Sequence, residues 1–353
     1  MAPTHSRHSL WSTPLGRRQL LKGLGLAGSL MALGAPGPVA EAFAADLASS
    51  GTGTGEIPLR PLGKSGVKVS AMCFGGAHWG RNPDDGEAIR LLHEAIDAGM
   101  TFLDNAWEYN GGRSEELMGK GLQGKRQQVF LMTKVCSHGR DKHVAMQQLE
   151  ESLRRLKTDY LDLWQIHEVV YEDDPDRHFM PHGAVDALLE AKQQGKVRFI
   201  GFTGHKHPAI HLKMLSHDFP FDACQMPLNV FDGTYRSFER EVLPVLAQRG
   251  IGALGMKSVT GNAEPIKQGV VTPQEAIRYV LSLPIASLVS GIDSAQILKQ
   301  NLEIVRRFTP MTVAEMEGLR ARVAMYAMDG RFELFKSTNR YDGRIGREQH
   351  GIS

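Results

Sequence analysis

The chain has 353 residues, of which 41 are Lys or Arg and 39 are Asp or Glu, so its formal net charge is only +2. Four of the basic residues and one of the acidic residues lie in residues 1–44, which leaves 37 basic and 38 acidic side chains and a net charge of −1 on the rest. Such a body lacks the positive surface that nucleic acid or an anionic membrane requires, which favours a small molecule as its partner.

Residues 1–44 have the pattern of an export signal. Arg17 and Arg18 begin the run RRQLLK, an apolar stretch follows over residues 23–33, and small residues around Ala42 offer cleavage positions. The apolar stretch is shorter than the roughly 20 residues that span a bilayer. We therefore expect export by the twin-arginine machinery to the periplasm or beyond, with no stable membrane span in the mature chain. The alternatives are a disordered basic N-terminus, or a short membrane anchor, on a cytoplasmic protein.

The folded body is predicted to begin at Ile57, because residues 45–56 have the small, flexible composition of a linker. The body contains an odd number of cysteines and no CxxC spacing, which suggests neither a disulfide framework nor a thiolate metal site. We expect no metal and three buried free thiols, Cys73, Cys136 and Cys224.

From residue 57 onwards, short apolar runs of strand type alternate with longer segments of helical period. The predicted strands are residues 70–74, 101–104, 129–133, 161–167, 197–203, 222–227, 251–256 and 287–290. The predicted helices are residues 86–98, 114–121, 142–156, 184–194, 208–216, 237–249, 273–283 and 295–308. Eight such units in succession predict an α/β fold with parallel strands and helical crossovers, a (β/α)₈ TIM barrel.

An open doubly wound sheet is the alternative arrangement of eight such units. That fold usually carries GxGxxG after its first strand, whereas residues 75–80 read GGAHWG, a poor match after which no helix is expected to begin. We therefore favour the closed barrel, over residues 57–328. It would include an N-terminal hairpin over residues 57–69 that closes the bottom and an extra helix over residues 312–328. The polar C-terminal tail, residues 329–353, is expected to be either a frayed terminus or a lid.

Polar residues follow three consecutive predicted strands, at the end of the barrel where catalytic groups lie. Asp104 ends the second strand, with Tyr109 just beyond it; Lys134 follows the third strand and His167 ends the fourth. Each residue alone has an ordinary explanation as a solvated, capping or loop residue. A carbonyl that accepts hydride, however, needs a proton donor and stabilisation of negative charge, and together these residues supply both.

The expected roles follow from the chemistry of the four side chains. A free Tyr has a pKa of about 10, too high for an acid at neutral pH unless a cation favours its phenolate. We expect Lys134 to be that cation and Asp104 to hold the ammonium in place. His167 is expected to bind and orient the substrate carbonyl.

These motifs resemble those of the aldo-keto reductase family, most closely its members with twin-arginine signals. The resemblance runs from about residue 59 to residue 302, and its motifs are FLDNA with Tyr109 and SE at 114–115, TK at 133–134, QIH at 165–167 and GKVRFIG at 195–201. It implies a (β/α)₈ barrel that uses NADP(H) or NAD(H). The implied reaction is reduction of an aldehyde or ketone, or oxidation of the alcohol, with Tyr109 as proton donor.

The resemblance also implies a set of cofactor contacts, which this chain matches less closely. Where the family usually has Ser-Asn after the fifth strand, this chain has Thr203-Gly204, and we expect His205 to replace the missing amide unless it belongs to a solvated cluster with His207 and His211. The other expected contacts are Gln225, Asn229, Met256, Lys257, Gly291, Asp293 and Asn301.

The choice between the two dinucleotides is open at this point. Asp293 lies where NADPH-preferring relatives often have Arg, and a carboxylate repels a 2′-phosphate but can bond a ribose hydroxyl. Asp293 therefore favours NADH, whereas the habit of the family favours NADPH.

The loops after the first, second and fourth strands contain aromatic residues that we expect to line an apolar substrate pocket, although packing elsewhere explains each of them equally well: Trp79, Trp107 and Tyr171. In the last of these loops, residues 173–178 are expected to form a solvated turn without a metal.

Two other functions compete with free reduction of a carbonyl substrate. An exported compartment is not expected to regenerate the dinucleotide, so the cofactor would instead stay bound and be recycled within one turnover, as in a redox isomerase or a sugar-processing lyase. Alternatively, the barrel is a non-catalytic module that senses the dinucleotide.

Overall fold

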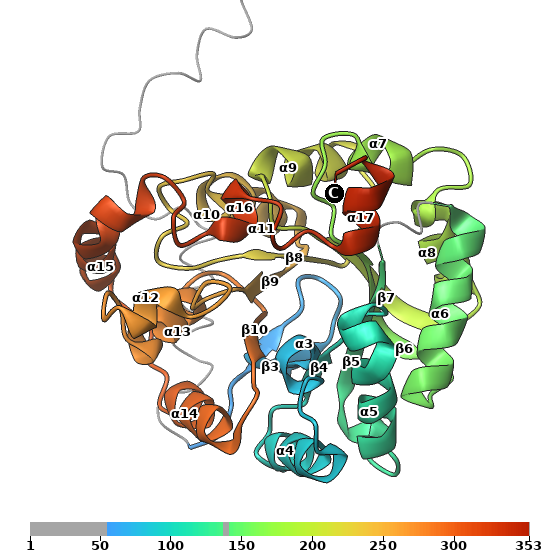
Figure 1. The fold of residues 1–353 in the computed structure, drawn as a ribbon, viewed down its shortest axis with the longest axis horizontal. Coiled ribbons are helices and arrows are strands. Elements are labelled where there is room, and N and C mark those ends of the chain that lie inside the picture. The colour runs from blue at the N-terminus through green and yellow to red at the C-terminus, as the bar shows by residue number, and fades with distance from the viewer. Residues whose placement is uncertain (1–54, 137–140, 353) are drawn as a thin grey trace, which may run out of the picture. The chain divides into compact units, whose positions relative to one another are not determined.

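The computed structural model describes residues 55–352 apart from residues 137–140. The predicted export signal and nearly all of the predicted linker lie outside the described residues. Within them, eight parallel strands close into a barrel that helices surround (Figure 1). The predicted (β/α)₈ fold is therefore confirmed. None of the helices in the described part of the chain is both long and apolar enough to cross a membrane.

The barrel strands follow one another in sequence order, with the last pairing to the first. All eight predicted strands are present, with ends that differ by three residues at most. Their bounds are β3 Met72–Gly75, β4 Phe102–Asp104, β5 Phe130–Cys136, β6 Leu161–His167, β7 Val197–Thr203, β8 Ala223–Pro227, β9 Gly252–Met256 and β10 Ser287–Gly291.

The crossover helices lie on the outer face of the barrel (Figure 1). Their bounds are α4 Asp85–Asp97, α5 Arg113–Gly121, α6 Lys142–Leu156, α8 Ala184–Gln193, α9 Pro208–Ser216, α10 Phe238–Glu241, α11 Leu243–Arg249, α13 Pro273–Leu281 and α14 Ala295–Arg306. The predicted extra helix is α15, Val313–Ala327. Short additional helices are α3 Gly76–Trp79, η1 Tyr109–Gly112, η2 Arg126–Gln128, α7 Asp174–His178, α12 Glu264–Lys267, α16 Leu334–Ser337 and α17 Arg344–Gln349.

Two helix predictions were wrong in detail. The single helix expected over residues 237–249 is divided into α10 and α11, because Pro244 has no N–H to donate and its ring excludes the carbonyl four residues earlier. The GGAHWG segment, where no helix was expected, forms the one-turn α3. This turn carries Trp79 into the core, where its indole Nε1 donates a hydrogen bond to the Ala88 carbonyl over 2.7 Å.

The N-terminal hairpin closes the bottom of the barrel as predicted. Its strands, β1 Leu59–Pro61 and β2 Lys68–Ser70, pair antiparallel, and Leu62 and Val69 pack with side chains of the barrel interior. Arg60 is only 2% exposed and donates hydrogen bonds to the carbonyls of Leu281 and Ile285, which precede β10.

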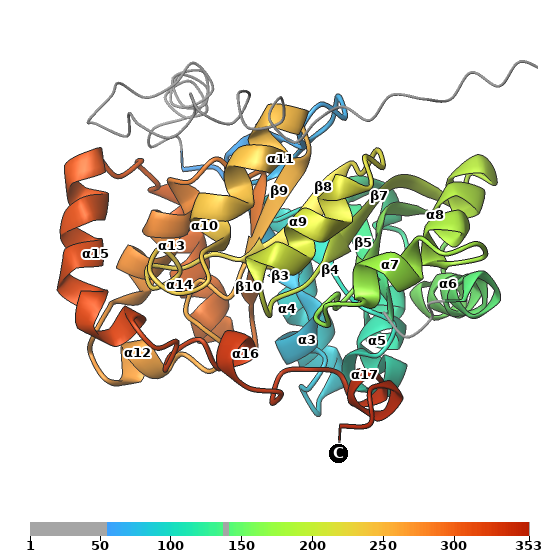
Figure 2. The ribbon, with the colours of Figure 1, turned by 90° about the horizontal axis from the view of Figure 1, so that it is seen from above.

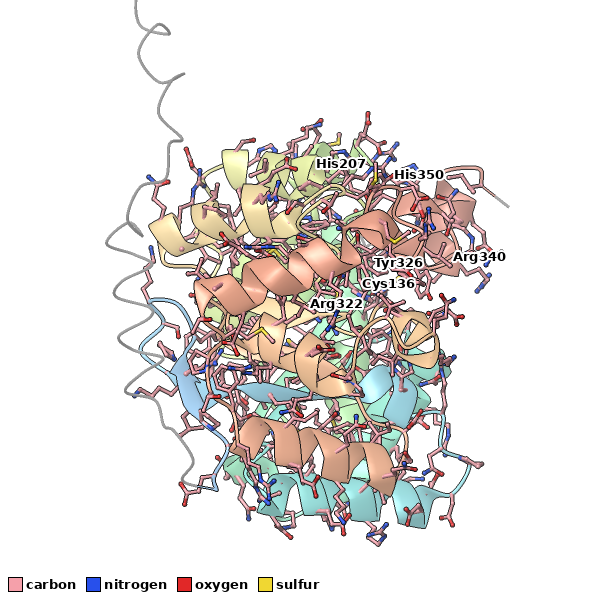
Figure 3. All side chains as sticks on the ribbon, turned by 90° about the vertical axis from the view of Figure 1, so that its left-hand side faces the viewer. Cys136, His207, Arg322, Tyr326, Arg340 and His350 are labelled. Carbon is pink, nitrogen blue, oxygen red and sulfur yellow. The ribbon has the colours of Figure 1, made fainter. Side chains whose placement is uncertain are left out.

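The C-terminal tail lies at the opposite end of the barrel from the hairpin (Figure 2). It was expected to be irregular but contains α16 and α17, and Figure 3 labels Arg340 and His350 at this end. The tail is therefore packed next to the carboxyl ends of the strands, where the predicted catalytic residues lie.

Candidate active site

Three of the four predicted catalytic side chains meet around the ammonium group of Lys134. β5 carries Lys134 into the mouth of the barrel, where it is 1% exposed. Its Nζ makes an ion pair with Asp104 Oδ1, donates to the Asn105 carbonyl over 2.7 Å, and lies 3.2 Å from the Tyr109 hydroxyl. An ammonium has three N–H donors, so these three contacts account for all of its hydrogen-bonding capacity.

The fourth predicted residue, His167, adjoins this group through Tyr109. The two rings meet edge to face, with centroids 5.6 Å apart and an interplanar angle of 82°. The structure therefore brings all four predicted residues into one cluster at the carboxyl ends of β4, β5 and β6. A phenol, an ammonium and an imidazole around a shared space can together donate a proton and stabilise charge on an oxygen.

The protonation of the cluster differs from the sequence-based expectation in one respect. Lys134 was expected to lower the pKa of Tyr109, but burial raises that pKa well above its usual value, and the carboxylates of Asp104 and Glu108 raise it further. Burial also raises the pKa of Asp104, although the charge and hydrogen bond of Lys134 act against it. Tyr109 is consequently a neutral phenol at neutral pH, which is the form that can donate a proton.

Glu108 belongs to this site although it was not among the predicted residues. Its Oε1 lies within hydrogen-bonding distance of His167 Nδ1. Burial would raise the pKa of Glu108, but the charge and hydrogen bond of His167 outweigh burial and the pKa is lowered. Its position beside Tyr109, in the loop after a barrel strand, is the sequence feature from which it could have been predicted.

Two further charged residues, Glu168 and Lys257, directly follow the ends of β6 and β9. Both have positive φ angles, 66° and 59°, which are strained for residues other than Gly and cluster at functional sites. Burial raises the pKa of Glu168 to about 8, and loss of hydration lowers the pKa of Lys257 to about 8. Lys257 was predicted as a cofactor contact, whereas Glu168 was missed although it follows a strand end.

The predicted cofactor residues of β7, β8 and β9 form a second polar group inside the barrel. Gln225 Oε1 accepts a hydrogen bond from Gln165 over 3.0 Å, and Gln225 Nε2 lies 3.6 Å from the sulfur of Met256. Thr203, the residue before Gly204, is buried. A Cβ on Gly204 would lie 2.2 Å from the Val169 carbonyl oxygen, so no amide side chain fits at that position.

Comparison with known proteins agrees with this geometry. A sequence model of the aldo/keto reductase family matches residues 71–263. The chain belongs to the aldo/keto reductase family. The uncharacterized oxidoreductase YqkF of Bacillus subtilis (strain 168) is 26% identical over 304 residues, covering 73% of this chain and 95% of that protein.

Two further comparisons support the assignment. L-galactose dehydrogenase of Arabidopsis thaliana is 30% identical over 239 residues, covering 62% of this chain and 68% of that enzyme. The holo form of aldo-keto reductase AKR11C1 from Bacillus halodurans superposes with a TM-score of 0.64 at 25% identity, covering 76% of this chain and 96% of that one. As an aldo/keto reductase, the protein is an NAD(P)H-dependent oxidoreductase.

The barrel mouth has features that fit a dinucleotide in this aldo/keto reductase. Gln165 Oε1 is buried and, among the described residues, has no hydrogen-bond partner, so it can accept from the carboxamide of a nicotinamide. A hollow of about 510 Å³ lies between the loops after β3 and β10, lined by His78, Arg81, Asn82, Pro83, Asp293 and Ser294. Arg81 offers this hollow a cation, and the predicted contact Asp293 is exposed in its wall.

The remaining predicted contacts near β10 have structural partners. Asn301 is buried on α14 and donates a hydrogen bond to Ser290 Oγ over 3.0 Å, which ties the helix to the end of the strand. Gly291 lies against His78, since a Cβ there would be 2.6 Å from His78 Nδ1. Both residues therefore shape the mouth of the barrel around the hollow.

Two predicted cofactor residues, His205 and Asn229, contact the C-terminal tail instead of open space. His205 Nε2 lies 3.3 Å from Asp342 Oδ1, and Asn229 donates to Glu333 Oε1 over 2.9 Å. Burial lowers the pKa of His205 to about 4. With His211 also fully buried, the alternative of a solvated histidine cluster is wrong for these two residues.

The tail reaches the charged residues of the mouth as well. The backbone N–H of Gly343 donates to Glu168 Oε2 over 2.7 Å, and Lys206 Nζ lies 2.8 Å from Asp342 Oδ1. The rings of Phe335 and Tyr341 lie 5.2 and 5.0 Å from Lys257 Nζ. The tail thus contacts the ends of β6, β7, β8 and β9.

The aromatic residues predicted to line a substrate pocket are in three different environments. Trp79 lies in the core. Trp107 is half-buried in the loop after β4, and its Nε1 donates to Glu151 over 2.8 Å. Tyr171 stacks on His350 of the tail, with ring centroids 3.7 Å apart.

The turn predicted over residues 173–178 is not solvated throughout. It forms α7, in which Asp174 and His178 are fully buried. Asp174 accepts hydrogen bonds from the backbone N–H groups of Val170 and Tyr171, so its burial fixes the loop after β6. Cys73, Cys136 and Cys224 are buried and form no disulfide, as predicted.

Proposed function

We propose that this aldo/keto reductase reduces an aldehyde or ketone, or oxidises the corresponding alcohol, with Tyr109 as the proton donor. The observation that carries the proposal is the contact of 3.2 Å between the Tyr109 hydroxyl and Lys134 Nζ, within a cluster that also contains Asp104 and His167. All four groups lie where the barrel fold places catalysis.

The reaction follows from these side chains. NAD(P)H, when bound, supplies the hydride that the carbonyl carbon accepts. The carbonyl oxygen takes the phenolic proton of Tyr109, and the resulting phenolate is stabilised by the ammonium of Lys134. Asp104 holds that ammonium in position, and His167 donates a hydrogen bond to the same oxygen. In the reverse direction the phenolate accepts the proton of the alcohol.

The dinucleotide is expected to extend from the cluster to the hollow between β3 and β10. We expect Gln225, Thr203 and Met256 to contact the nicotinamide end, and Gly291, Asp293 and Asn301 to lie near the other end. Asp293 favours NADH, because a carboxylate repels a 2′-phosphate, whereas Arg81 in the same hollow and the habit of the family favour NADPH, so both dinucleotides stay candidates. Comparing the Kd of the two dinucleotides for the wild type and Asp293→Asn tests the contribution of Asp293.

The test of the catalytic assignment is steady-state oxidation of NAD(P)H with a panel of aldehydes and ketones. Tyr109→Phe should lower kcat by at least 100-fold, because the general acid is removed. Tyr160→Phe is a matched control, since its hydroxyl makes only a surface contact to Gln127. Unchanged turnover by Tyr109→Phe would refute the assignment.

A second candidate function is favoured by the tail. Its contacts to Glu168, His205, Asn229 and Lys257 cover the predicted cofactor path, as expected of a lid that retains a bound dinucleotide. A retained cofactor suits a redox isomerase or a sugar-processing lyase, in which hydride leaves and returns within one turnover. Extensive dialysis, followed by denaturation and mass spectrometry of any released oxidised or reduced dinucleotide, distinguishes the two, because a rapidly emptied site excludes retention.

Export by the twin-arginine machinery is part of the same proposal, since a folded protein can carry a cofactor that was loaded beforehand. The support is the RRQLLK run with the apolar stretch behind it. Cell fractionation of the wild type and of a variant with both Arg17→Lys and Arg18→Lys should show the periplasmic pool only for the wild type. Equal distribution of the two would favour the cytoplasmic alternative.

A further inference from the structure

The His167 ring has a carboxylate on one of its two nitrogens. His167 Nδ1 pairs with Glu108 Oε1, and Glu108 comes from the loop after β4, two strands away from the end of β6. The backbone N–H of Trp107 donates to the Lys134 carbonyl over 3.1 Å, and Arg155 donates to the Trp107 carbonyl over 2.8 Å. Glu108 is therefore presented to His167 by a loop whose backbone is held at Trp107, the residue immediately before it.

Glu108 pairs with His167 and not with Lys134, because the donors of Lys134 are already used by other groups. The three donors of Lys134 are directed to Asp104, the Asn105 carbonyl and the Tyr109 hydroxyl. No donor of Lys134 remains for Glu108. The two carboxylates therefore form two separate pairs, Asp104 with the Lys134 ammonium and Glu108 with the His167 ring.

A carboxylate on Nδ1 has two consequences for an imidazole. It fixes Nδ1 as a donor, and it favours the doubly protonated ring, in which Nε2 also carries a proton. A neutral ring with its proton on Nδ1 would have only a lone pair on Nε2 and could not donate to a carbonyl oxygen. Burial of the second oxygen of Glu108 costs free energy, because Oε2 has no hydrogen-bond partner among the described residues.

We infer that Glu108 is a positioning residue, which orients the ring of His167 and holds it in the charged form that donates from Nε2 to the substrate oxygen. This inference rests on the proposed reductase function. It adds to that function a residue that acts through His167 and does not itself touch the substrate.

Other charged groups near Glu108 and His167 also affect the electrostatics of this pair. They come from Asp104, Lys134 and Tyr109 on one side and from Glu168, with Lys257 and Asp342 beyond it, on the other. Glu108→Gln leaves all of them in place, keeps the shape of the side chain and removes one charge. Glu116→Gln makes the same chemical change at an exposed position of α5 and is the matched control.

The test combines a pH profile with direct titration of the ring. In Glu108→Gln, the pKa of His167 followed by NMR of labelled histidine should fall by about one unit or more, with the signal assigned by its loss in His167→Asn. The kcat/KM for carbonyl reduction should fall about tenfold at pH 7.5 and recover as the pH is lowered. Glu116→Gln should match the wild type in both measurements.

An unchanged pKa of His167 in Glu108→Gln, or a loss of kcat/KM that is equal at every pH, would overturn the inference. Failure of the proposed function gives a different result: the wild type itself would not turn over carbonyl substrates, while the NMR titration would still show whether Glu108 controls the charge of His167.

Discussion

Removing the buried ammonium of Lys336 should destabilise the protein by about 3 kcal/mol. Lys336 lies in α16 and is fully buried, and its Nζ lies 2.5 Å from Asp232 Oδ1, 2.8 Å from Glu333 Oε1 and 2.8 Å from the Tyr235 carbonyl. In Lys336→Met both carboxylates stay buried without their cation. Breaking a buried pair in this way costs about 3 to 5 kcal/mol.

The lower end of that range is expected because one carboxylate can neutralise itself. Burial already raises the pKa of Glu333 to about 7, so without Lys336 it takes up a proton at modest cost. Asp232 accepts hydrogen bonds from Ser237 Oγ and from the backbone of Phe238 and Glu239, which remain in the variant. Most of the loss is therefore expected from breaking the buried contact between Asp232 and Lys336.

Urea denaturation followed by circular dichroism measures this loss, with the exposed Lys299→Met on α14 as the control. If the tail instead detaches locally in Lys336→Met, the free energy of global unfolding will fall by less. Limited proteolysis will then cut the chain near Gly330. A free energy of unfolding within about 0.5 kcal/mol of the wild type, together with an uncut tail, would refute the reasoning.

Three further predictions concern single side chains. Gly204→Ala should cost about 1 to 3 kcal/mol, because its Cβ would lie 2.2 Å from the Val169 carbonyl oxygen, and an unchanged urea midpoint would contradict this. Trp79→Ala should cost about 3 to 5 kcal/mol in the same assay, because it empties a fully buried site and removes the indole hydrogen bond to the Ala88 carbonyl. The difference in free energy of unfolding between Glu168→Gln and the wild type should shift in favour of the variant as the pH rises from 5 to 8. In the wild type the folded protein keeps the Glu168 proton up to about pH 8 while the unfolded chain loses it near 4.5, so wild-type stability falls across this window. A stability difference between the two proteins that stays constant with pH would exclude this account.

The sequence predicted the barrel well because its signals are local. Each strand is a short apolar run, and several crossover helices are bounded by their own turn residues, so the strand ends could be located to within three residues. Placing Asp104, Lys134 and His167 at the ends of consecutive strands then brings them together without further information.

What the sequence did not predict depends on contacts between distant segments. The pairing of Glu108 with His167 joins the loop after β4 to the end of β6, and the burial of His205 depends on Asp342, 137 residues further along the chain. The periodicity of residues 329–353 carries no sign of the surface on which they pack. The raised pKa of Tyr109 was likewise invisible, because it depends on burial and on carboxylates from more than one loop.

The two ends of the described chain lie on opposite faces of the barrel, and this has a practical result for anyone purifying the protein. The tail contacts Tyr171 through His350 and Glu168 through Gly343, so a fusion partner or affinity tag joined to the tail would lie on the face that carries the candidate active site. A tag attached ahead of the β1–β2 hairpin would begin at the far face (Figure 2). Assays of turnover are therefore best made with a tag on the hairpin side.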